Sequence, residues 1–124
     1  NRIAPALVPL LPTCGFTHLS QHGPRARSEP VARLGRINTH VDPIDWRGDR
    51  RTLPEARVLD MLVAHLGARR TGVADGREPT GLLTHHLDMD EAGWRLMAQL
   101  IERLAGHRAV RWLGPGELFP MPSW

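Results

Sequence analysis

Two short segments carry side chains suited to acid–base chemistry, and each belongs to an apolar, alternating stretch of chain. Asp42 and Asp45 follow residues 37–41, and His85 lies near the end of the stretch that begins at Gly81. A carboxylate beside an imidazole fixes the tautomer of the ring and raises its pKa, which prepares a histidine to act as a general acid. The residue types therefore predict a catalytic pair of Asp45 and His85.

Two apolar side chains beside this pair are candidates for the wall of a substrate pocket. Trp46 follows Asp45, and Leu83 precedes His85 by two residues. Because side chains alternate between the two faces of a strand, Leu83 and His85 are expected on the same face. A structural interpretation remains open, since Asp-x-x-Asp at a strand end often forms a turn whose carboxylates accept backbone N–H groups.

Hydrophobic periodicity predicts the elements that must position these residues. Strands are expected over residues 16–20, 37–41, 81–86 and 109–113, and helices over 3–13, 52–70 and 88–104. Thr52 with Glu55 and Asp88 with Glu91 have the spacing of helix capping boxes. Strands that alternate with helices form crossover units on a mostly parallel sheet. Because one such unit separates residues 37–41 from residues 81–86, these two strands are expected to be neighbours. Ligands bind such sheets at the carboxyl ends of the strands.

Composition excludes several classes of function. The 124 residues are enough for one modest domain, and the net charge is only +3. All basic residues are arginines scattered among the carboxylates, which argues against a nucleic-acid partner. A single cysteine, Cys14, excludes an internal disulfide. The longest uncharged stretch, residues 3–16, is short and contains three prolines, so no membrane span or signal peptide is expected and a cytoplasmic location is favoured.

Three segments carry a resemblance to a known family. The segment His40–Trp46 resembles the Asp-x-x-Asp-Trp motif of the polysaccharide deacetylases, which are metal-dependent carbohydrate N-deacetylases. Leu83–His85 resembles the Leu-x-His motif of that family, and Asn1–Pro5 looks like the segment that follows its Arg-x-Pro motif. The resemblance implies an α/β fold, a partial (β/α) barrel, in which residues 1–124 form the carboxyl-terminal part of a single catalytic domain.

The resemblance also implies roles for the candidate residues. His85 matches the general acid that protonates the leaving amine, and Asp45 matches the carboxylate that tunes it. Trp46 and Leu83 match the walls of the pocket for the acetyl methyl group. The implied reaction is removal of an N-acetyl group from an amino sugar or polysaccharide, so the expected partner of the whole protein is a carbohydrate.

Other parts of the family pattern are missing. The chain has no Asp-Asp pair, which would supply the catalytic base and a metal ligand. His18 and His22 have the spacing of the histidine motif, but Leu19 replaces its hydroxyl residue. The resemblance thus implies a divalent metal, with zinc expected, whose ligands are not in this chain, and we expect the isolated chain to be inactive. The alternatives are a noncatalytic α/β binding or interaction module and a degenerate deacetylase homologue; the oligomeric state stays open.

Overall fold

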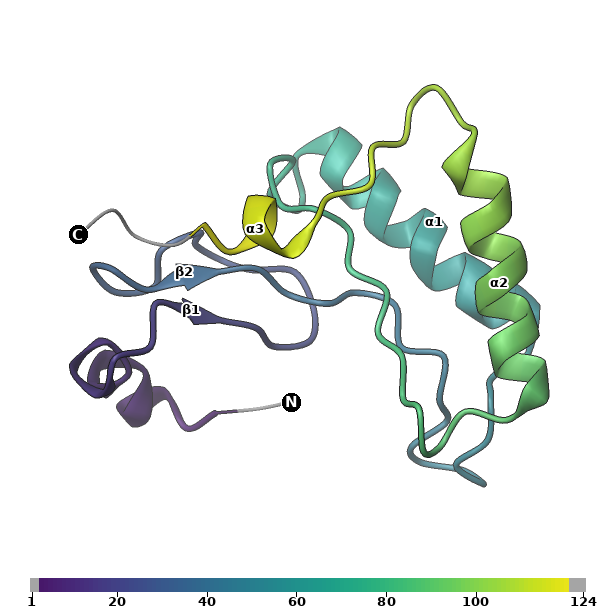
Figure 1. Cartoon of the computed structure of the whole chain (residues 1–124), viewed down its shortest axis with the longest axis horizontal. Helices are drawn as coiled ribbons and strands as arrows, with labels where there is room; N and C mark the ends of the chain where they lie inside the picture. Colours follow the sequence, from purple (N-terminus) through teal and green to yellow (C-terminus); the bar gives the residue numbers. More distant parts are fainter. Residues whose placement is uncertain (1–2, 121–124) are drawn as a thin grey trace.

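The computed structural model describes residues 3–120. Along the chain the elements are the 3-10 helices η1 (Pro5–Leu10) and η2 (Pro12–Cys14), the strands β1 (His18–Leu19) and β2 (Gly35–Arg36), and the helices α1 (Glu55–Thr71), α2 (Glu91–Ala105) and α3 (Pro115–Leu118). Figure 1 shows the strands and the 3-10 helices at one end of the molecule and α1 and α2 at the other. No helix in residues 3–120 has both the length and the apolar character needed to cross a membrane.

The predicted sheet is wrong. β1 and β2 form a parallel pair of two residues each, and no larger sheet is present in the described residues. Residues 81–86 contribute a single bridge, from Leu82 to Val41, and residues 109–113 are irregular. The chain is therefore not a mostly parallel sheet with crossover helices, and it does not form a partial (β/α) barrel.

Side chains explain why the alternating segments do not become long strands. Three extended stretches still run in parallel, over residues 17–23, 35–41 and 81–83. Between the first two, Thr39 N donates to Gln21 O at 2.9 Å, as in a regular ladder. Elsewhere side chains take the place of carbonyls: Asn38 Oδ1 accepts from Gln21 N, and His40 Nδ1 accepts from Gly81 N, both at 3.0 Å. These side-chain bonds satisfy the backbone but interrupt the ladder.

The amino-terminal segment is helical, as predicted, but in a tighter form. Pro9 lies inside η1, and Pro12 begins η2. Because proline has no N–H and its ring clashes with the preceding turn, a continuous α-helix over residues 3–13 is not possible. Two short 3-10 helices result, and Gly15 ends the second in a left-handed conformation with φ of 84°.

The two long helices are confirmed, although their first residues differ from the prediction. α1 begins after Pro54, which has no side-chain cap, and α2 begins after Asp90, whose carboxylate accepts from Gly93 N at 2.9 Å. The Thr52 hydroxyl, predicted to cap α1, instead donates to Asp90 Oδ1 at 2.7 Å. This bond ties the approach to α1 to the start of α2.

One hydrophobic core lies between these helices and the extended segment that leads into the first candidate motif. Its buried members are Val41, Ile44, Val58, Leu62, Met89, Leu96, Met97 and Leu100. Val41 and Val58 are completely buried. Because Val41 and Ile44 are both held in this core, the chain at Asp42 is fixed from either side.

Candidate functional site

The bridge between Val41 and Leu82 brings the two candidate motifs together. The segments are parallel there, and Leu83 N donates to Val41 O at 2.9 Å. Asp42 follows the first segment and His85 the second, so both side chains lie where neighbouring segments end. The prediction that these two segments are neighbours is confirmed, even though neither forms a long strand.

His85 pairs with Asp42 and not with the predicted Asp45. The distance from His85 Nε2 to Asp42 Oδ1 is 3.0 Å, and the two side chains are 20% and 14% exposed. Asp42 Oδ1 also accepts from Ile44 N at 3.1 Å, and Asp42 Oδ2 accepts from Trp46 Nε1 at 2.8 Å. Three donors therefore hold one carboxylate, which leaves it little freedom.

Asp45 has the structural role that the sequence left open. Its Oδ1 accepts from Arg47 N at 3.2 Å and from Gly48 N at 2.9 Å, which closes the turn after the motif. Asp42 directly follows the buried Val41, whereas Asp45 lies three residues farther on, where the chain has already turned. The predicted Asp45–His85 hydrogen bond is therefore wrong, and Asp42 takes that place.

Trp46 lies against His85, as expected for the wall of a site. The two rings meet edge to face, with centroids 4.8 Å apart and planes at 80°. Leu83, the other predicted wall, is half-buried in the paired segment two residues before His85. Its role in a substrate pocket stays a prediction.

An arginine covers part of the Trp46 ring. Arg50 Cζ lies 5.2 Å from the ring centroid, within the range of a cation–π interaction. The same guanidinium is 3.7 Å from Asp88 Oδ1, and both of these side chains are exposed. Exposed contacts of both kinds contribute little to stability, so Arg50 covers the ring without being rigidly held.

The described residues do not offer a metal centre. Within residues 3–120, no three His, Cys, Asp or Glu side chains come together as possible ligands. His18, one half of the predicted histidine spacing, instead contacts the Thr17 hydroxyl at 3.0 Å, and its ring meets that of Phe119 edge to face. The divalent metal implied by the resemblance would need ligands from outside this part of the chain.

Sequence reasoning missed a buried polar cluster, which we call the Glu78 cluster: Arg25, Asn38, His40, His65 and Glu78. Glu78 is completely buried and accepts from Asn38 N at 3.0 Å and from Arg25 N at 2.9 Å. His40 Nε2 lies 3.2 Å from Glu78 Oε2, but its N–H does not point at that oxygen, so the contact is electrostatic. One feature of the sequence could have indicated this cluster: polar residues occupy every second position of one extended segment, at Asn38, His40 and Asp42.

The two histidines of the Glu78 cluster are stacked and poorly solvated. Their ring centroids are 3.7 Å apart with planes at 18°, and His65 Nε2 is buried without a hydrogen-bond partner in the described residues. Burial lowers the pKa of His40, and the neighbouring Glu78 partly offsets this. Burial also lowers the pKa of His65, and the charge of a protonated His40 lowers it further. Burial therefore favours the neutral form of both rings.

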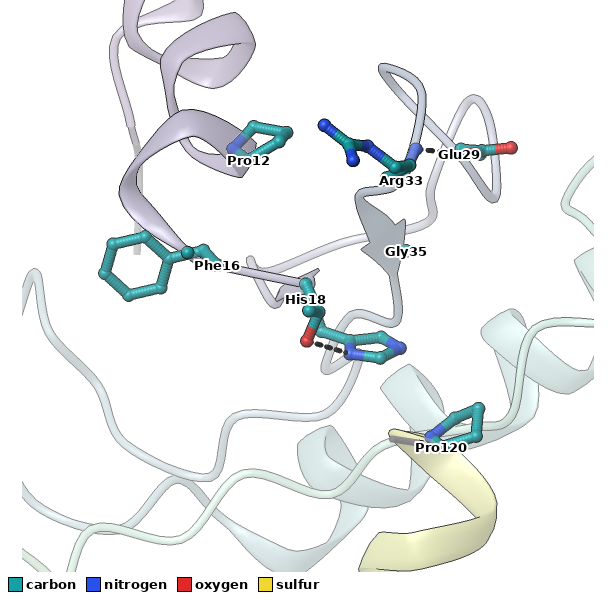
Figure 2. A pocket seen from close by; sticks show the side chains of 9 residues that line it. Pro12, Phe16, His18, Glu29, Arg33, Gly35 and Pro120 are labelled. Atoms are coloured by element: carbon teal, nitrogen blue, oxygen red, sulfur yellow. Dashed lines mark hydrogen bonds between the residues drawn. The ribbon is translucent and has the colours of Figure 1, made fainter. Parts of the chain in front are cut away.

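A cavity of about 490 Å³ lies apart from the Asp42–His85 pair (Figure 2). Its lining residues are Pro12, Gly15, Phe16, Thr17, His18, Glu29, Arg33, Gly35 and Pro120. The carboxylate of Glu29 accepts from the backbone N of Arg33 at 2.6 Å. His18 lines it, but Asp45, Trp46, Leu83 and His85 do not, so the cavity lies outside the candidate acid–base site.

Searches of protein-family models, curated proteins and solved structures found no match to this chain. The likeness to the polysaccharide deacetylases therefore depends on the motifs at Asp42–Trp46 and Leu83–His85, which lie at neighbouring segment ends, and on the Asn1–Pro5 segment, whose first two residues lie outside the described residues.

Proposed function

We propose that this chain supplies the proton-donating part of a hydrolase site that removes an N-acetyl group from an amino sugar or polysaccharide. The observation that supports this most directly is the Asp42–His85 hydrogen bond of 3.0 Å, with Trp46 packed against the imidazole. A histidine held by a carboxylate in a partly buried site is a common form of general acid.

The chemistry requires a proton at the leaving nitrogen. When water adds to the acetyl carbonyl carbon, the C–N bond breaks and its electron pair remains on the nitrogen. In our proposal the His85 imidazolium gives its proton to that nitrogen, so that an amine leaves and acetate is the second product. Asp42 orients the ring, and Trp46 shields one side of it from water.

The substrate class comes from the resemblance of the Asp42–Trp46 and Leu83–His85 segments to the deacetylase motifs. The general base and the divalent metal, with zinc expected, belong in this proposal to chain outside the described residues. Without them, we expect the 124-residue chain alone to release no acetate.

The test is a pair of adjacent histidine variants in the full-length product of the gene. His85→Ala should lower kcat for acetate release from N-acetylglucosamine oligomers by about 10²- to 10⁴-fold, as expected for loss of a general acid. His86→Ala is the matched control, because His86 is exposed and outside the pair. Equal turnover in the two variants would remove His85 from the mechanism.

A second pair separates the two aspartates. Asp42→Asn removes the carboxylate bonded to His85, whereas Asp45→Asn affects only the turn. The proposal expects a large loss of kcat in the first variant and a small one in the second. If the full-length protein binds the oligomers but never releases acetate, the chain belongs to a binding module or a degenerate homologue.

A further inference from the structure

The Asp42 carboxylate has three donors, and Trp46 supplies one of them. The Ile44 N–H and the His85 ring both bond to Oδ1, at 3.1 and 3.0 Å. The Trp46 indole N–H bonds to Oδ2 at 2.8 Å, and it is the one donor to that oxygen in the described residues. Without it, Oδ2 would have no protein partner, and the carboxylate could rotate about its Cβ–Cγ bond.

Trp46 also restrains the imidazole directly. Its ring meets His85 at 80° with centroids 4.8 Å apart. One side chain therefore contacts both members of the pair, through its N–H on the carboxylate and its ring on the histidine. Trp46 is fixed in turn by its backbone N–H, which donates to Ile44 O at 3.1 Å, and Arg50 covers part of its ring.

The arrangement determines which histidine nitrogen carries the proton in the neutral ring. The N–H groups of Ile44 and Trp46 are donors, so the Asp42 oxygens accept, and a carboxylate can only accept. His85 Nε2 must therefore donate to Asp42. Its Nδ1 has no hydrogen-bond partner in residues 3–120 and is left for exchange with a substrate or with water.

We propose that Trp46 is a positioning residue. Its indole N–H holds Asp42 in the rotamer that keeps the neutral His85 protonated on Nε2, so that Nδ1 is the nitrogen presented to the reacting group. This inference rests on the proposed function for its purpose, but the geometry behind it can be tested without any turnover.

The test is ¹⁵N NMR of the histidine rings in the 124-residue chain, at a pH where His85 is neutral. In the parent chain, the His85 signals should show a single tautomer with the proton on Nε2. Trp46→Phe keeps an aromatic ring and removes the N–H, and it should give a mixture of tautomers. Trp94→Phe is the matched control, since Trp94 lies on α2 and is similarly exposed, at 43% against 42% for Trp46.

A third variant calibrates the measurement. In Asp42→Asn the amide nitrogen can turn toward His85 and donate to Nε2, which would favour the proton on Nδ1. The ¹⁵N signals of the two His85 ring nitrogens would then exchange their protonated and unprotonated positions. A His85 spectrum of Trp46→Phe identical to that of Trp94→Phe would overturn the proposal. In the full-length protein, Trp46→Phe should lower kcat by about tenfold or more with little change in KM, because it misplaces the reacting group.

The two proposals fail in different ways. If the tautomer changes as expected but the full-length protein releases no acetate, the positioning role stands and the deacetylase assignment is wrong. If acetate is released but the tautomer of Trp46→Phe is unchanged, the positioning role is wrong.

Discussion

Removing the carboxylate of Glu78 should destabilise the chain more than any comparable surface change. Glu78 is completely buried and accepts from the backbone N–H groups of Arg25 and Asn38. In Glu78→Ala both donors lose their acceptor, and each buried, unsatisfied group costs about 1–3 kcal/mol. The Asn38 bond is buried and the Arg25 bond only partly so. We therefore expect the free energy of unfolding to fall by about 2–4 kcal/mol, from a total of about 5–15 kcal/mol for a domain of this kind.

The assay is urea unfolding followed by tryptophan fluorescence, at a fixed pH above neutrality. Glu78→Gln should lower the free energy of unfolding less than Glu78→Ala does, because the amide oxygen still accepts from one of the two donors while the NH₂ group faces the other. Glu102→Ala is the control, since Glu102 is exposed on α2, and it should change the free energy of unfolding by no more than about 0.5 kcal/mol. If Glu78→Ala unfolds at the same urea concentration as Glu102→Ala, the Glu78 cluster does not stabilise this fold.

Two further predictions concern the same region. Burial lowers the pKa of His40 and of His65 from the ordinary value of 6.5, so below that pH the unfolded chain binds more protons than the folded chain. The contribution of these two histidines to stability should therefore be complete above about pH 7 and should fall as the pH drops toward 5. His65→Phe keeps a stacked ring but cannot be protonated, so its Tm should depend less steeply on pH than that of the parent chain. An equal dependence of Tm on pH in the two proteins would contradict this prediction. At Gly81, a Cβ would lie 2.8 Å from Asn38 O, whereas at Gly76 the nearest atom would be 3.5 Å away. Gly81→Ala should thus lower Tm by several degrees and Gly76→Ala only slightly, and similar Tm values would show that the two segments are not so closely apposed.

Much of the helical framework and part of the site could be predicted from local sequence. α1 and α2 were predicted because their apolar residues recur with helical spacing. The meeting of residues 37–41 with residues 81–85 was predicted because a single helical crossover separates the two segments. The first conclusion depends on patterns within a few neighbouring residues, and the second on the order of the elements that those patterns define, so both can be read from a single sequence.

The sheet and the partner of His85 could not be predicted in the same way. Whether neighbouring extended segments form a ladder depends on what accepts from their backbone N–H groups. Here the Asn38 side chain accepts from Gln21 N and the His40 side chain accepts from Gly81 N, in place of backbone carbonyls. Glu78 bonds to residues 40 and 53 positions away in the sequence, so no local pattern marks it. Asp42 and Asp45 have the same chemistry, and only the exact point at which the chain turns decides which of them reaches His85.

The bond between Gly81 and His40 has a kinetic consequence. His40 Nδ1 already accepts the Gly81 amide at 3.0 Å, so the lone pair that a proton would need is occupied. A proton can bind there only after the bond from the Gly81 N–H has broken, whereas the backbone bonds from His40 N to Gly81 O and from Leu83 N to Val41 O can stay in place. His40 Nδ1 therefore takes up a proton no faster than this one bond opens, and the opening removes one of the several hydrogen bonds between the segments that end in Asp42 and His85.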